Sequence, residues 1–321
     1  MNNEVNRELT ARQRERWLAA LAGLLHDVGK LAQRAGWESG KHPERGAEFV
    51  TRYVPETWRD QLYAVAGHHE KPLHGRRNRV VALADHLSAS EREETREAAE
   101  RQLRTILGRV TTEQTPRTTG KVWPLEPLAL ERDALFPHDP VNAEAETRAY
   151  QALWDGFVAA VDGLPGDDLP TYVTGLFHAL RRFTWSVPGA YYRSKPDVSL
   201  YDHSRTTAAL AACLVDLDDD RLDALLDGER ADTAPDEPLV LLVGGDVSGV
   251  QDFIYTITAR GAAKGLRGRS FYLEALTEAV ARYVLRRLEL PITNLIYAGG
   301  GHFYLLAPGD AEADLDAVRA E

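Results

Sequence analysis

The stretch Leu24-Leu25-His26-Asp27-Val28-Gly29-Lys30 decides how this chain is organised. It continues an apolar run with helical spacing that begins near Trp17 and Leu18, and it ends in an adjacent His and Asp. An imidazole nitrogen and a carboxylate oxygen side by side can bind one cation. This ligand mix suits Mn²⁺, Fe²⁺, Co²⁺, Ni²⁺ or Zn²⁺ better than Mg²⁺. The dipeptide alone is a weak signal, because Asp202-His203 repeats it in reverse order.

Three segments downstream place the same residue types beside apolar, helix-like runs. They are Lys41-His42-Pro43-Glu44, with Pro43 in the first turn of a predicted helix, Ala64-Val65-Ala66-Gly67-His68-His69-Glu70, and Val80-Val81-Ala82-Leu83-Ala84-Asp85-His86. Four helices that each end in a His or Asp can bring those ends onto one or two metal ions. Any single histidine is equally well explained as a hydrogen-bonded core residue. The four runs together favour a metal site.

These motifs resemble the HD superfamily of metal-dependent phosphohydrolases. The segments that carry the resemblance are Leu25 to Lys30, His42 to Ala47, His68 to Glu70 and Ala84-Asp85. The resemblance implies one or two divalent transition metals, with Mn, Ni or Co expected, and one Asp that can bridge two ions. The implied metal ligands are His26, Asp27, His42, His68, His69 and Asp85, and the implied catalytic residues are His26, Asp27 and Lys30, the last as a stabiliser of phosphoryl oxygens.

One departure from that family concerns an additional histidine. HD domains usually carry a further ligand His on a helix before the His-Asp pair, yet residues 1–25 contain no His. The run Ser199 to Ala211 supplies a candidate, with His203 at the start of a predicted helix that has an apolar face. The order implies a circularly permuted HD domain, which is tolerable because domain termini often lie close together. The alternative for His203 is a residue near a helix start that binds no metal.

The composition of the chain bounds its class. At 321 residues, with 44% hydrophobic and 27% charged residues, it is long enough for two globular domains. The net charge of -11 argues against nucleic-acid binding by the molecule as a whole, so such contacts would need local basic patches. The single cysteine, Cys213, lies in an apolar run and is predicted to be buried, which favours a reducing cytoplasm. No apolar run approaches 18 residues, so no membrane association is expected.

The first domain is predicted to be all-helical and to cover residues 1–215. Residues 107–147 are rich in Thr and Pro and are expected to form a looped excursion. Helices are predicted at 144–162 and 169–184, with a core stripe of Tyr150, Leu153, Trp154 and Phe157. Residues 216–237 are crowded with Asp, which indicates an acidic linker and a domain boundary.

From residue 238 the pattern becomes strand-like. Strands are predicted at 239–243, 294–298 and 302–307, with a basic turn at 263–270 and a long helix from Phe271 to about Leu288. The order β-α-β-β is the first part of a ferredoxin-like fold, whose remaining helix and strand would follow residue 310. The overall fold class is therefore α+β, with an incomplete ferredoxin-like second domain at 238–321.

This second domain resembles the Palm domain of nucleotide polymerases and cyclases. The runs 244–254 and 266–274, together with Ser199 to Leu210, are similar to the large HD–Palm subunit of type III CRISPR effector complexes, the III-A kind in particular. The resemblance implies ATP as a Palm ligand, with the surface lined by Gly245, Asp246, Ser248, Gly249, Gly299, Gly300 and Gly301. Lys264, Arg267 and Arg269 are expected to meet either triphosphate or protein.

The Palm departs from an active one at its hairpin. Two-metal phosphoryl transfer needs carboxylates in that turn, whereas Gly299-Gly300-Gly301-His302 has none. In the family, a second Palm carries the acidic turn and makes cyclic oligoadenylates, and these 321 residues hold no second Palm. The chain is therefore expected to be a truncated fragment or one part of a split protein, without synthase activity of its own.

The resemblance implies a component of an RNA-guided type III-A interference complex. Its HD domain would cut single-stranded DNA, and its partners would be the other subunits, CRISPR RNA, target RNA and a second Palm. Two alternatives stay open from the residues alone. One is an HD phosphohydrolase of a nucleotide or cyclic dinucleotide with a sensor Palm, and the other is a non-catalytic assembly scaffold with a vestigial HD site.

Overall fold

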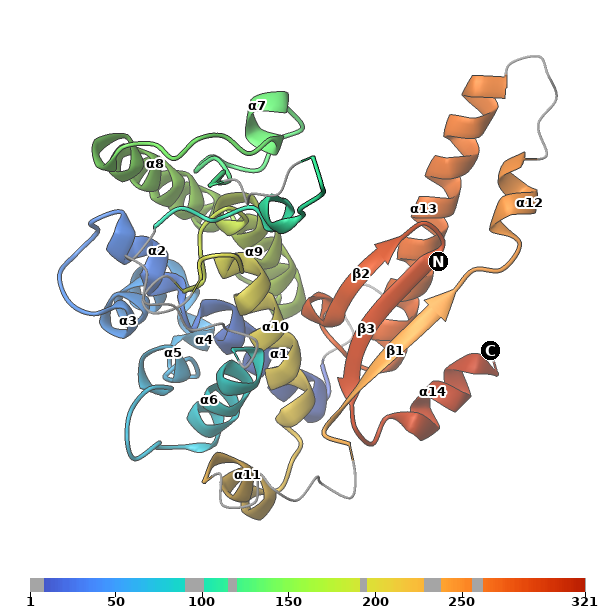
Figure 1. The fold of residues 1–321 in the computed structure, drawn as a ribbon. Coiled ribbons are helices and arrows are strands. Elements are labelled where there is room, and N and C mark those ends of the chain that lie inside the picture. The colour runs from blue at the N-terminus through green and yellow to red at the C-terminus, as the bar shows by residue number, and fades with distance from the viewer. Residues whose placement is uncertain are drawn as a thin grey trace. The chain divides into compact units, whose positions relative to one another are not determined.

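The computed structural model describes residues 9–89, 101–114, 120–190, 195–227, 238–255 and 262–320 (Figure 1). The chain divides into two compact units. The helical unit comprises residues 18–208, and the sheet unit comprises residues 1–17 and 209–321. The division falls within two helices, α1 (Ala11–Leu25) and α10 (Leu200–Leu214). The domain ranges expected from the sequence stay a prediction.

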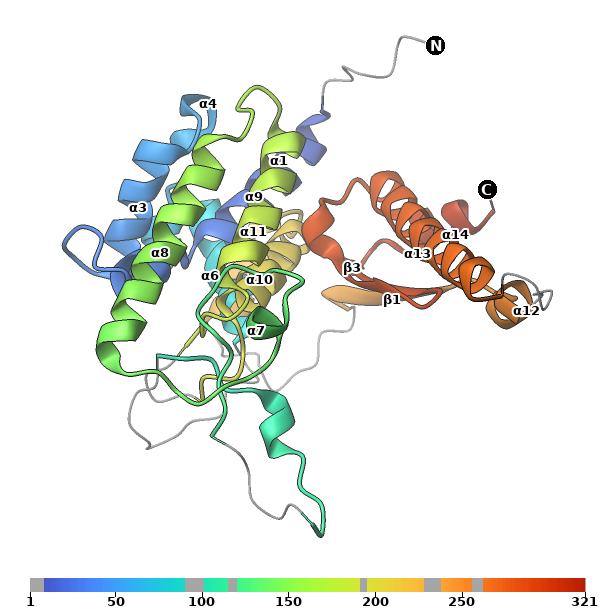
Figure 2. The same ribbon diagram turned by 90° about the horizontal axis from the view of Figure 1, so that it is seen from above.

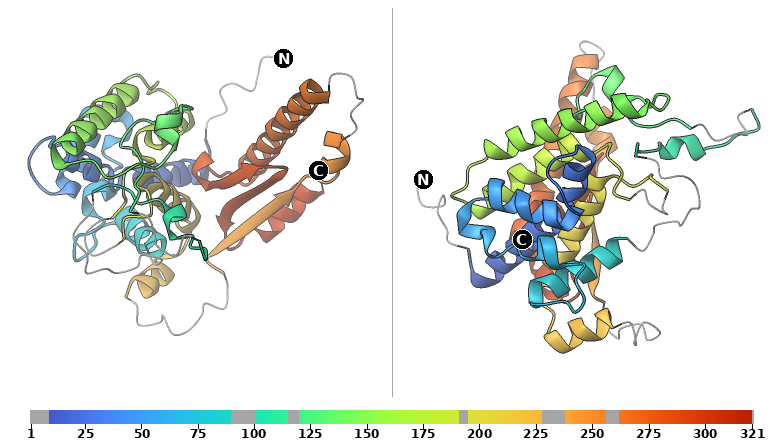
Figure 3. Two further views of the ribbon diagram at one scale, coloured as in Figure 1. Left: turned by 45° about the horizontal axis from the view of Figure 1, so that its top comes forward. Right: turned by 90° about the vertical axis from the view of Figure 1, so that its left-hand side faces the viewer.

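Most of the described residues of the helical unit lie in helices. In chain order they are α1 from residue 18 onward, α2 (Val28–Arg34), α3 (His42–Tyr53), α4 (Glu56–Arg59), α5 (Ala64–Gly67), α6 (Arg76–Ser88), η1 (Ile106–Arg109), α7 (Arg132–Leu135), α8 (Ala143–Asp162), α9 (Leu169–Thr184) and α10 up to residue 208. Side-chain caps start the two long helices, since Asn142 accepts from the Ala145 amide and Asp168 accepts from the Thr171 amide. Figure 3 shows α8 and α9 side by side.

The core stripe predicted on α8 is confirmed. Tyr150, Leu153 and Phe157 are fully buried, and Trp154 is 4% exposed. Phe49 of α3 stacks on Phe157 with 5.5 Å between ring centroids. Burial of each such side chain contributes about 1.5–3 kcal/mol. This apolar stripe therefore packs α8 against α3, one of the helices that carry the candidate site.

The sheet unit contains three strands in the spatial order β1-β3-β2. They are β1 (Val240–Asp246), β2 (Leu295–Gly299) and β3 (His302–Pro308), and both pairings are antiparallel. The helices are α11 (Asp219–Leu226), α12 (Val250–Tyr255), α13 (Ala262–Arg287), η2 (Ile292–Asn294) and α14 (Glu312–Arg319), besides the part of α10 from residue 209. The predicted α+β class and the β-α-β-β order with its final hairpin are confirmed.

One face of this sheet is covered by helices. Alternate residues of β3, Phe303 and Leu305, are buried, as are Leu273 and Ala281 of α13. Figure 2 shows α13 and α14 on the same side of the sheet. A period of two along β3 is the pattern of a strand with one covered face.

The predicted basic turn at 263–270 is wrong, because these residues are the first turns of α13. Ala, Leu, Lys and Arg are strong helix formers, and they outweigh Gly265 and Gly268 in this segment. Arg269 on α13 donates to the Phe253 carbonyl oxygen of α12 at 2.5 Å. At least this one of the three basic side chains contacts protein.

Two simpler expectations concern burial and apolar length. Cys213 is 3% exposed, so its predicted burial is confirmed. Within the described ranges, none of the helices has the uninterrupted apolar length that a bilayer crossing requires.

Candidate metal centre

The first two candidate ligands stand in the turn between α1 and α2, and α10 brings a third to them. A Cβ atom at Gly23 on α1 would lie 2.6 Å from the Cα atom of Ala208 on α10, so only glycine permits this close approach. Going from Gly23 toward His26 along α1 corresponds to going from Ala208 back toward His203 along α10. The two helices therefore run antiparallel, and His26 Nε2 lies 3.1 Å from His203 Nε2 although 177 residues separate them.

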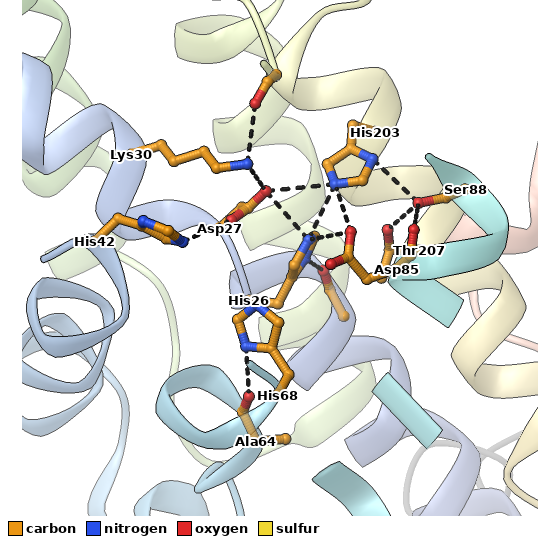
Figure 4. A network of polar contacts seen from close by, with 12 residues as sticks. His26, Asp27, Lys30, His42, Ala64, His68, Asp85, Ser88, His203 and Thr207 are labelled. Carbon is orange, nitrogen blue, oxygen red and sulfur yellow. Dashed lines mark hydrogen bonds and ion pairs between the residues drawn. The ribbon is translucent and has the colours of Figure 1, made fainter. Parts of the chain in front are cut away.

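The other candidates come from α3, α5 and α6 (Figure 4). His42 is the first residue of α3, His68 directly follows α5, and Asp85 lies in α6 one turn before its end. The predicted helix start with Pro43 in its first turn is confirmed for α3, whereas Asp85 does not close α6, which continues to Ser88. Side chains on the inward face of a helix can reach a common centre from either end of the helix. The direction of the side chain, and not its place at a helix terminus, therefore decides whether it joins the cluster.

Five of the predicted ligands form an inner group with almost no solvent exposure. His26, Asp27, His68, Asp85 and His203 are each at most 7% exposed. Asp27 Oδ2 lies 3.3 Å from Nε2 of both His26 and His203. Asp85 Oδ1 lies 3.1 Å from His203 Nε2 and 3.6 Å from His26 Nε2. The nitrogen and oxygen atoms that ligate metals in other proteins thus converge on one small volume.

The two remaining predicted ligands lie toward solvent. His42 Nε2 is 3.7 Å from Asp27 Oδ1, and the ring centroids of His42 and His69 are 5.4 Å apart. His69 offers a ligand atom within 4.8 Å of atoms on Asp27 and His68. Two further groups meet the same distance limit, namely His26 with His68 and Asp85, and His26 with Asp27 and His203. Asp27 contributes to both the inner and the outer side.

The polar atoms of this cluster fit a divalent cation. Asp27 Oδ1, His42 Nε2 and His68 Nε2 are buried and find no hydrogen-bond partner among the described residues. Buried polar atoms without partners are costly, so three of them at one place indicate a ligand that they bind. His26 Nδ1 donates to the Gly23 carbonyl oxygen at 2.7 Å, and His68 Nδ1 donates to that of Ala64 at 3.0 Å. In its neutral form, each of these rings presents the lone pair of Nε2 to the cluster.

The surroundings of His42 and His68 favour the neutral form of their imidazole rings. Burial lowers the pKa of His42 to about 4. The nearby Asp27 carboxylate raises this pKa, whereas Lys30 and His69 lower it further. Burial, together with His26, lowers the pKa of His68 to about 3. Both imidazoles are therefore neutral at pH 7, which is the form that binds metals.

The two carboxylates set the charge of the inner group. Burial would raise the pKa of Asp27, but the Lys30 ammonium and His26 outweigh it and hold that pKa well below its usual value. The pKa of Asp85 is likewise lowered despite burial, because His203 and His26 face it. Burial would lower the pKa of His26, yet Asp27 and Asp85 raise it to about 10. Two buried carboxylates thus demand positive charge at this spot, from a proton or from a metal.

The predicted nucleotide-binding residues also gather at one place, in the sheet unit. Gly245 and Asp246 end β1, Ser248 and Gly249 form the turn before α12, and Gly299, Gly300 and Gly301 form the β2–β3 turn. The Val247 amide donates to the Gly301 carbonyl oxygen at 2.8 Å, which joins the two turns. Positive φ angles at Gly249, Gly300 and Gly301 explain why glycine is needed there. Beside the β2–β3 turn, His302 Nδ1 lies 2.6 Å from Asp246 Oδ1.

Two hydroxyls beside the metal centre were missed by the sequence reasoning. Ser88 Oγ lies 3.1 Å from His203 Nδ1 and 2.8 Å from Thr207 Oγ1. Ser88 follows Asp85 by three residues and Thr207 follows His203 by four, so each shares a helix face with a predicted ligand. These spacings could have identified both hydroxyls from the sequence. In the sheet unit, the Glu274 carboxylate that accepts from the Gly300 amide at 3.3 Å was missed as well.

Known families match both parts of the chain. A family model described as the HD domain matches residues 3–90, and one described as Csm1 subunit domain B matches residues 239–321. The CRISPR system single-strand-specific deoxyribonuclease Cas10/Csm1 (subtype III-A) of Methanocaldococcus jannaschii is 33% identical over 89% of this chain and 40% of its own length. The protein of the same name from Thermococcus onnurineus is 30% identical over 95% of this chain and 40% of its own length.

Solved structures agree with these relatives. The crystal structure of Csm1 from T. onnurineus matches with a TM-score of 0.70 and 28% identity, covering 95% of this chain and 41% of that one. The Csm1–Csm4 cassette in complex with cA4 matches with a TM-score of 0.68, 28% identity and the same coverage. The cassette in complex with one ATP matches with a TM-score of 0.68 and 27% identity, again over 95% and 41%.

The family predicted from the sequence is thus confirmed. The chain spans about two fifths of the length of the curated relatives, 40% for both of these proteins. It belongs with the Cas10/Csm1 proteins of subtype III-A, and it carries an HD domain followed by a Csm1 domain B.

Proposed function

We propose that the helical unit is a metal-dependent nuclease that cuts single-stranded DNA as part of a type III-A CRISPR effector complex. The observation that carries this proposal is the convergence of imidazole nitrogens and carboxylate oxygens, with unpartnered buried atoms on Asp27, His42 and His68. The printed names of the relatives, single-strand-specific deoxyribonucleases, support the substrate. A cytoplasmic location follows from the same assignment.

The donor set supports two metal positions that share Asp27. On the inner side, Oδ2 of Asp27 faces His26 and His203, and Asp85 completes the group. On the outer side, the unpartnered Oδ1 of Asp27 faces His42, with His68 and His69 nearby. A ligand set dominated by imidazole, with carboxylates added, favours Mn²⁺, Co²⁺ or Ni²⁺ over Mg²⁺.

The roles of the residues follow from their positions. The cluster would hold a divalent cation, whose chemistry there would be to activate water near neutral pH and to offset negative charge on the phosphoryl oxygens. Asp27 and Asp85 provide the negative charge that holds the cation, and the low pKa values of His42 and His68 keep their rings available as ligands. Lys30 Nζ donates to Asp27 Oδ2 and to the Gly189 carbonyl oxygen, which leaves its charge at the rim of the cluster, where it can stabilise a phosphate.

For the sheet unit we propose an ATP-facing role that needs a second Palm from outside these residues. The seven residues gathered around the β1–α12 and β2–β3 turns would form the surface, and the turn without a carboxylate would leave it without catalysis of its own. Relatives solved with one ATP and with cA4 support the ligand class. Csm4, which is part of those cassettes, is the expected protein partner, together with CRISPR RNA and target RNA in the complex.

The nuclease proposal is tested by cleavage of labelled single-stranded DNA in the presence of Mn²⁺. We expect the wild-type chain to cleave and the His26→Ala/Asp27→Ala double variant to lose cleavage. His86→Ala is the matched control, because His86 adjoins Asp85 on α6 but its side chain is exposed. Equal cleavage by the double variant would contradict the assignment. If the metal-loaded protein hydrolyses a small nucleotide or cyclic dinucleotide but does not cleave DNA, the small molecule would replace single-stranded DNA as the proposed substrate.

A further inference from the structure

A single hydroxyl group links the helix that carries Asp85 to the helix that carries His203. Ser88 on α6 is 5% exposed, and its Oγ atom makes three short polar contacts (Figure 4). They are with the Asp85 carbonyl oxygen at 3.0 Å, Thr207 Oγ1 at 2.8 Å and His203 Nδ1 at 3.1 Å. Thr207 is itself fully buried on α10. No solvent is needed to satisfy this group.

The number of hydrogens decides the direction of these contacts. A serine hydroxyl has one hydrogen and two lone pairs, and a carbonyl oxygen can only accept. If Ser88 donates to Asp85, it can accept from both Thr207 and His203, and all three contacts are hydrogen bonds. If Ser88 donates to His203 or to Thr207 instead, its oxygen faces the Asp85 carbonyl oxygen without a hydrogen between them, and the lone pairs of the two oxygens repel each other. Only the first arrangement makes all three contacts of Ser88 hydrogen bonds, and it requires a hydrogen on His203 Nδ1.

His203 differs in this respect from the other two buried histidines. The Nδ1–H groups of His26 and His68 donate to backbone carbonyl oxygens of Gly23 and Ala64, one helical turn earlier in the chain. A side-chain substitution cannot remove those acceptors. The acceptor for His203 is a side chain from another helix, so its ring orientation depends on residue 88.

We infer that Ser88 is a positioning residue for the metal centre: its hydroxyl oxygen accepts the Nδ1–H of His203 and thereby turns the Nε2 lone pair of that ring toward Asp27, Asp85 and His26. The inference rests on the proposed metal-dependent function and adds a residue that does not itself touch the metal. Partners of this kind typically change metal affinity by about 10- to 100-fold when they are removed. Thr207 supports Ser88 by donating to it.

The first measurement is Mn²⁺ binding by calorimetry to the whole chain, with no nuclease readout. Ser88→Ala removes the acceptor and should weaken binding by about 10- to 100-fold. Ser88→Thr keeps the hydroxyl and should restore most of the affinity. Ser186→Ala is the matched control, because the Ser186 hydroxyl is equally buried but has no hydrogen-bond partner among the described residues. It should bind like the wild type.

The outcomes separate this inference from the proposed function. Wild-type affinity in folded Ser88→Ala would overturn the role of Ser88 and leave the metal site intact. A wild-type chain that binds no Mn²⁺, Co²⁺ or Ni²⁺ would overturn the metal centre and the inference together.

A second measurement reads the wild-type chain directly, and a variant serves only to assign the resonance. Long-range ¹H–¹⁵N correlation spectra of the metal-free wild type report whether Nδ1 of His203 carries a hydrogen, with the resonance assigned by its loss in His203→Gln. We expect a protonated Nδ1. An unprotonated Nδ1 would overturn the inference, since Ser88 would then be the donor.

Discussion

At the residue scale, Asp27 is the centre of the site. Its Oδ2 atom contacts Lys30, His26 and His203, while its Oδ1 atom is buried without a partner among the described residues and faces His42 at 3.7 Å. A carboxylate whose two oxygens face different sets of nitrogens is the natural bridge between two cations. The neighbouring lysine supplies a fixed positive charge to the same carboxylate, so the site combines a ligand and its counter-charge within one helical turn.

Lys30 should matter more for the chemical step than for metal binding. We expect Lys30→Met to lower kcat for DNA cleavage by about 10²- to 10³-fold, the usual loss when a fixed donor to a transition-state oxygen is removed. Its affinity for Mn²⁺ should be kept, because Lys30 is not a ligand. Lys41→Met, an exposed lysine at the start of α3, is the control and should cleave normally. Loss of Mn²⁺ binding in Lys30→Met would show instead that the lysine holds the ligands in place.

Metal binding should release a proton. Because Asp27 and Asp85 raise the pKa of His26 to about 10, its ring is protonated at pH 7 in the metal-free protein, whereas a ligand nitrogen must be free. The apparent affinity for Mn²⁺ should therefore rise by about tenfold per pH unit between pH 7 and 9. Calorimetry in buffers of different ionisation enthalpy measures the released proton. An affinity that does not change over this range would show that His26 is already neutral.

The same shift has a consequence for stability. The pKa of His26 is higher in the folded, metal-free chain than in the unfolded chain, so the folded state binds the extra proton between about pH 6.5 and 10. This stabilisation is complete below pH 6.5 and is lost as the pH rises toward 10. His42 and His68 act in the opposite direction, since their lowered pKa values favour the unfolded state below pH 6.5.

At the scale of elements, two glycines set the helix spacings that the site requires. Gly23 allows α10 to approach α1, and Gly29 allows α3 to approach α2. A Cβ atom at Gly29 would lie 1.8 Å from the His42 carbonyl oxygen, which is backbone and cannot move aside cheaply. The glycine that follows the His-Asp pair by two residues thus positions the histidine that opens α3.

Gly29→Ala should separate α2 from α3. We expect it to lower the free energy of unfolding by about 1–3 kcal/mol through overpacking, and to weaken Mn²⁺ binding because His42 moves away from Asp27. Urea unfolding gives the first quantity, with an unchanged m-value as the sign of an unchanged fold. In the control, Gly120→Ala, the new Cβ atom meets no atom within 4 Å, so the cost should be negligible. Equal stability of the two variants would contradict the close packing.

At the scale of the whole molecule, segments far apart in sequence combine within the sheet unit. Arg16 on α1 is 3% exposed, and its guanidinium donates to Asp216 at 2.8–2.9 Å and to the Leu288 carbonyl oxygen at 2.8 Å. Asn294 is fully buried and donates to the carbonyl oxygens of Ala209 and Leu306. The compact unit therefore includes parts of α1 and α10 in addition to the segment matched as domain B.

The buried arginine should contribute more than its exposed neighbour to the stability of the fold. Arg16→Met should lower the free energy of unfolding by about 2 kcal/mol, because the partly exposed Asp216 carboxylate and the buried Leu288 carbonyl oxygen lose their donor. Arg12 pairs with the same Asp216 at 3.0 Å, but its side chain is 46% exposed, so Arg12→Met should cost less than about 1 kcal/mol. Chemical denaturation of both variants measures the difference. A larger effect for Arg12 would contradict the importance of burial.

The sequence by itself determined the features that rest on local pattern. Strand-like apolar runs gave the three strands and their order along the chain. Helical spacing gave the buried stripe Tyr150, Leu153, Trp154 and Phe157, because burial on one face repeats with the geometry of the helix. Residue chemistry gave the predicted ligand types, since His and Asp beside apolar runs are expensive to bury without a cation. Helix boundaries were less secure, as the start of α13 at Ala262 shows, because propensity there outweighed two glycines.

Only the tertiary structure decided how these residues meet. The contact between His26 and His203 joins residues 177 positions apart, and it depends on the antiparallel packing of α1 and α10 at Gly23. Whether Ser88 and Thr207 serve the site depends on the same packing, since neither residue type marks a metal centre in sequence. Side-chain direction on a helix can be predicted locally, but the neighbour that it faces is set by how the helices pack, and that is a property of the whole core.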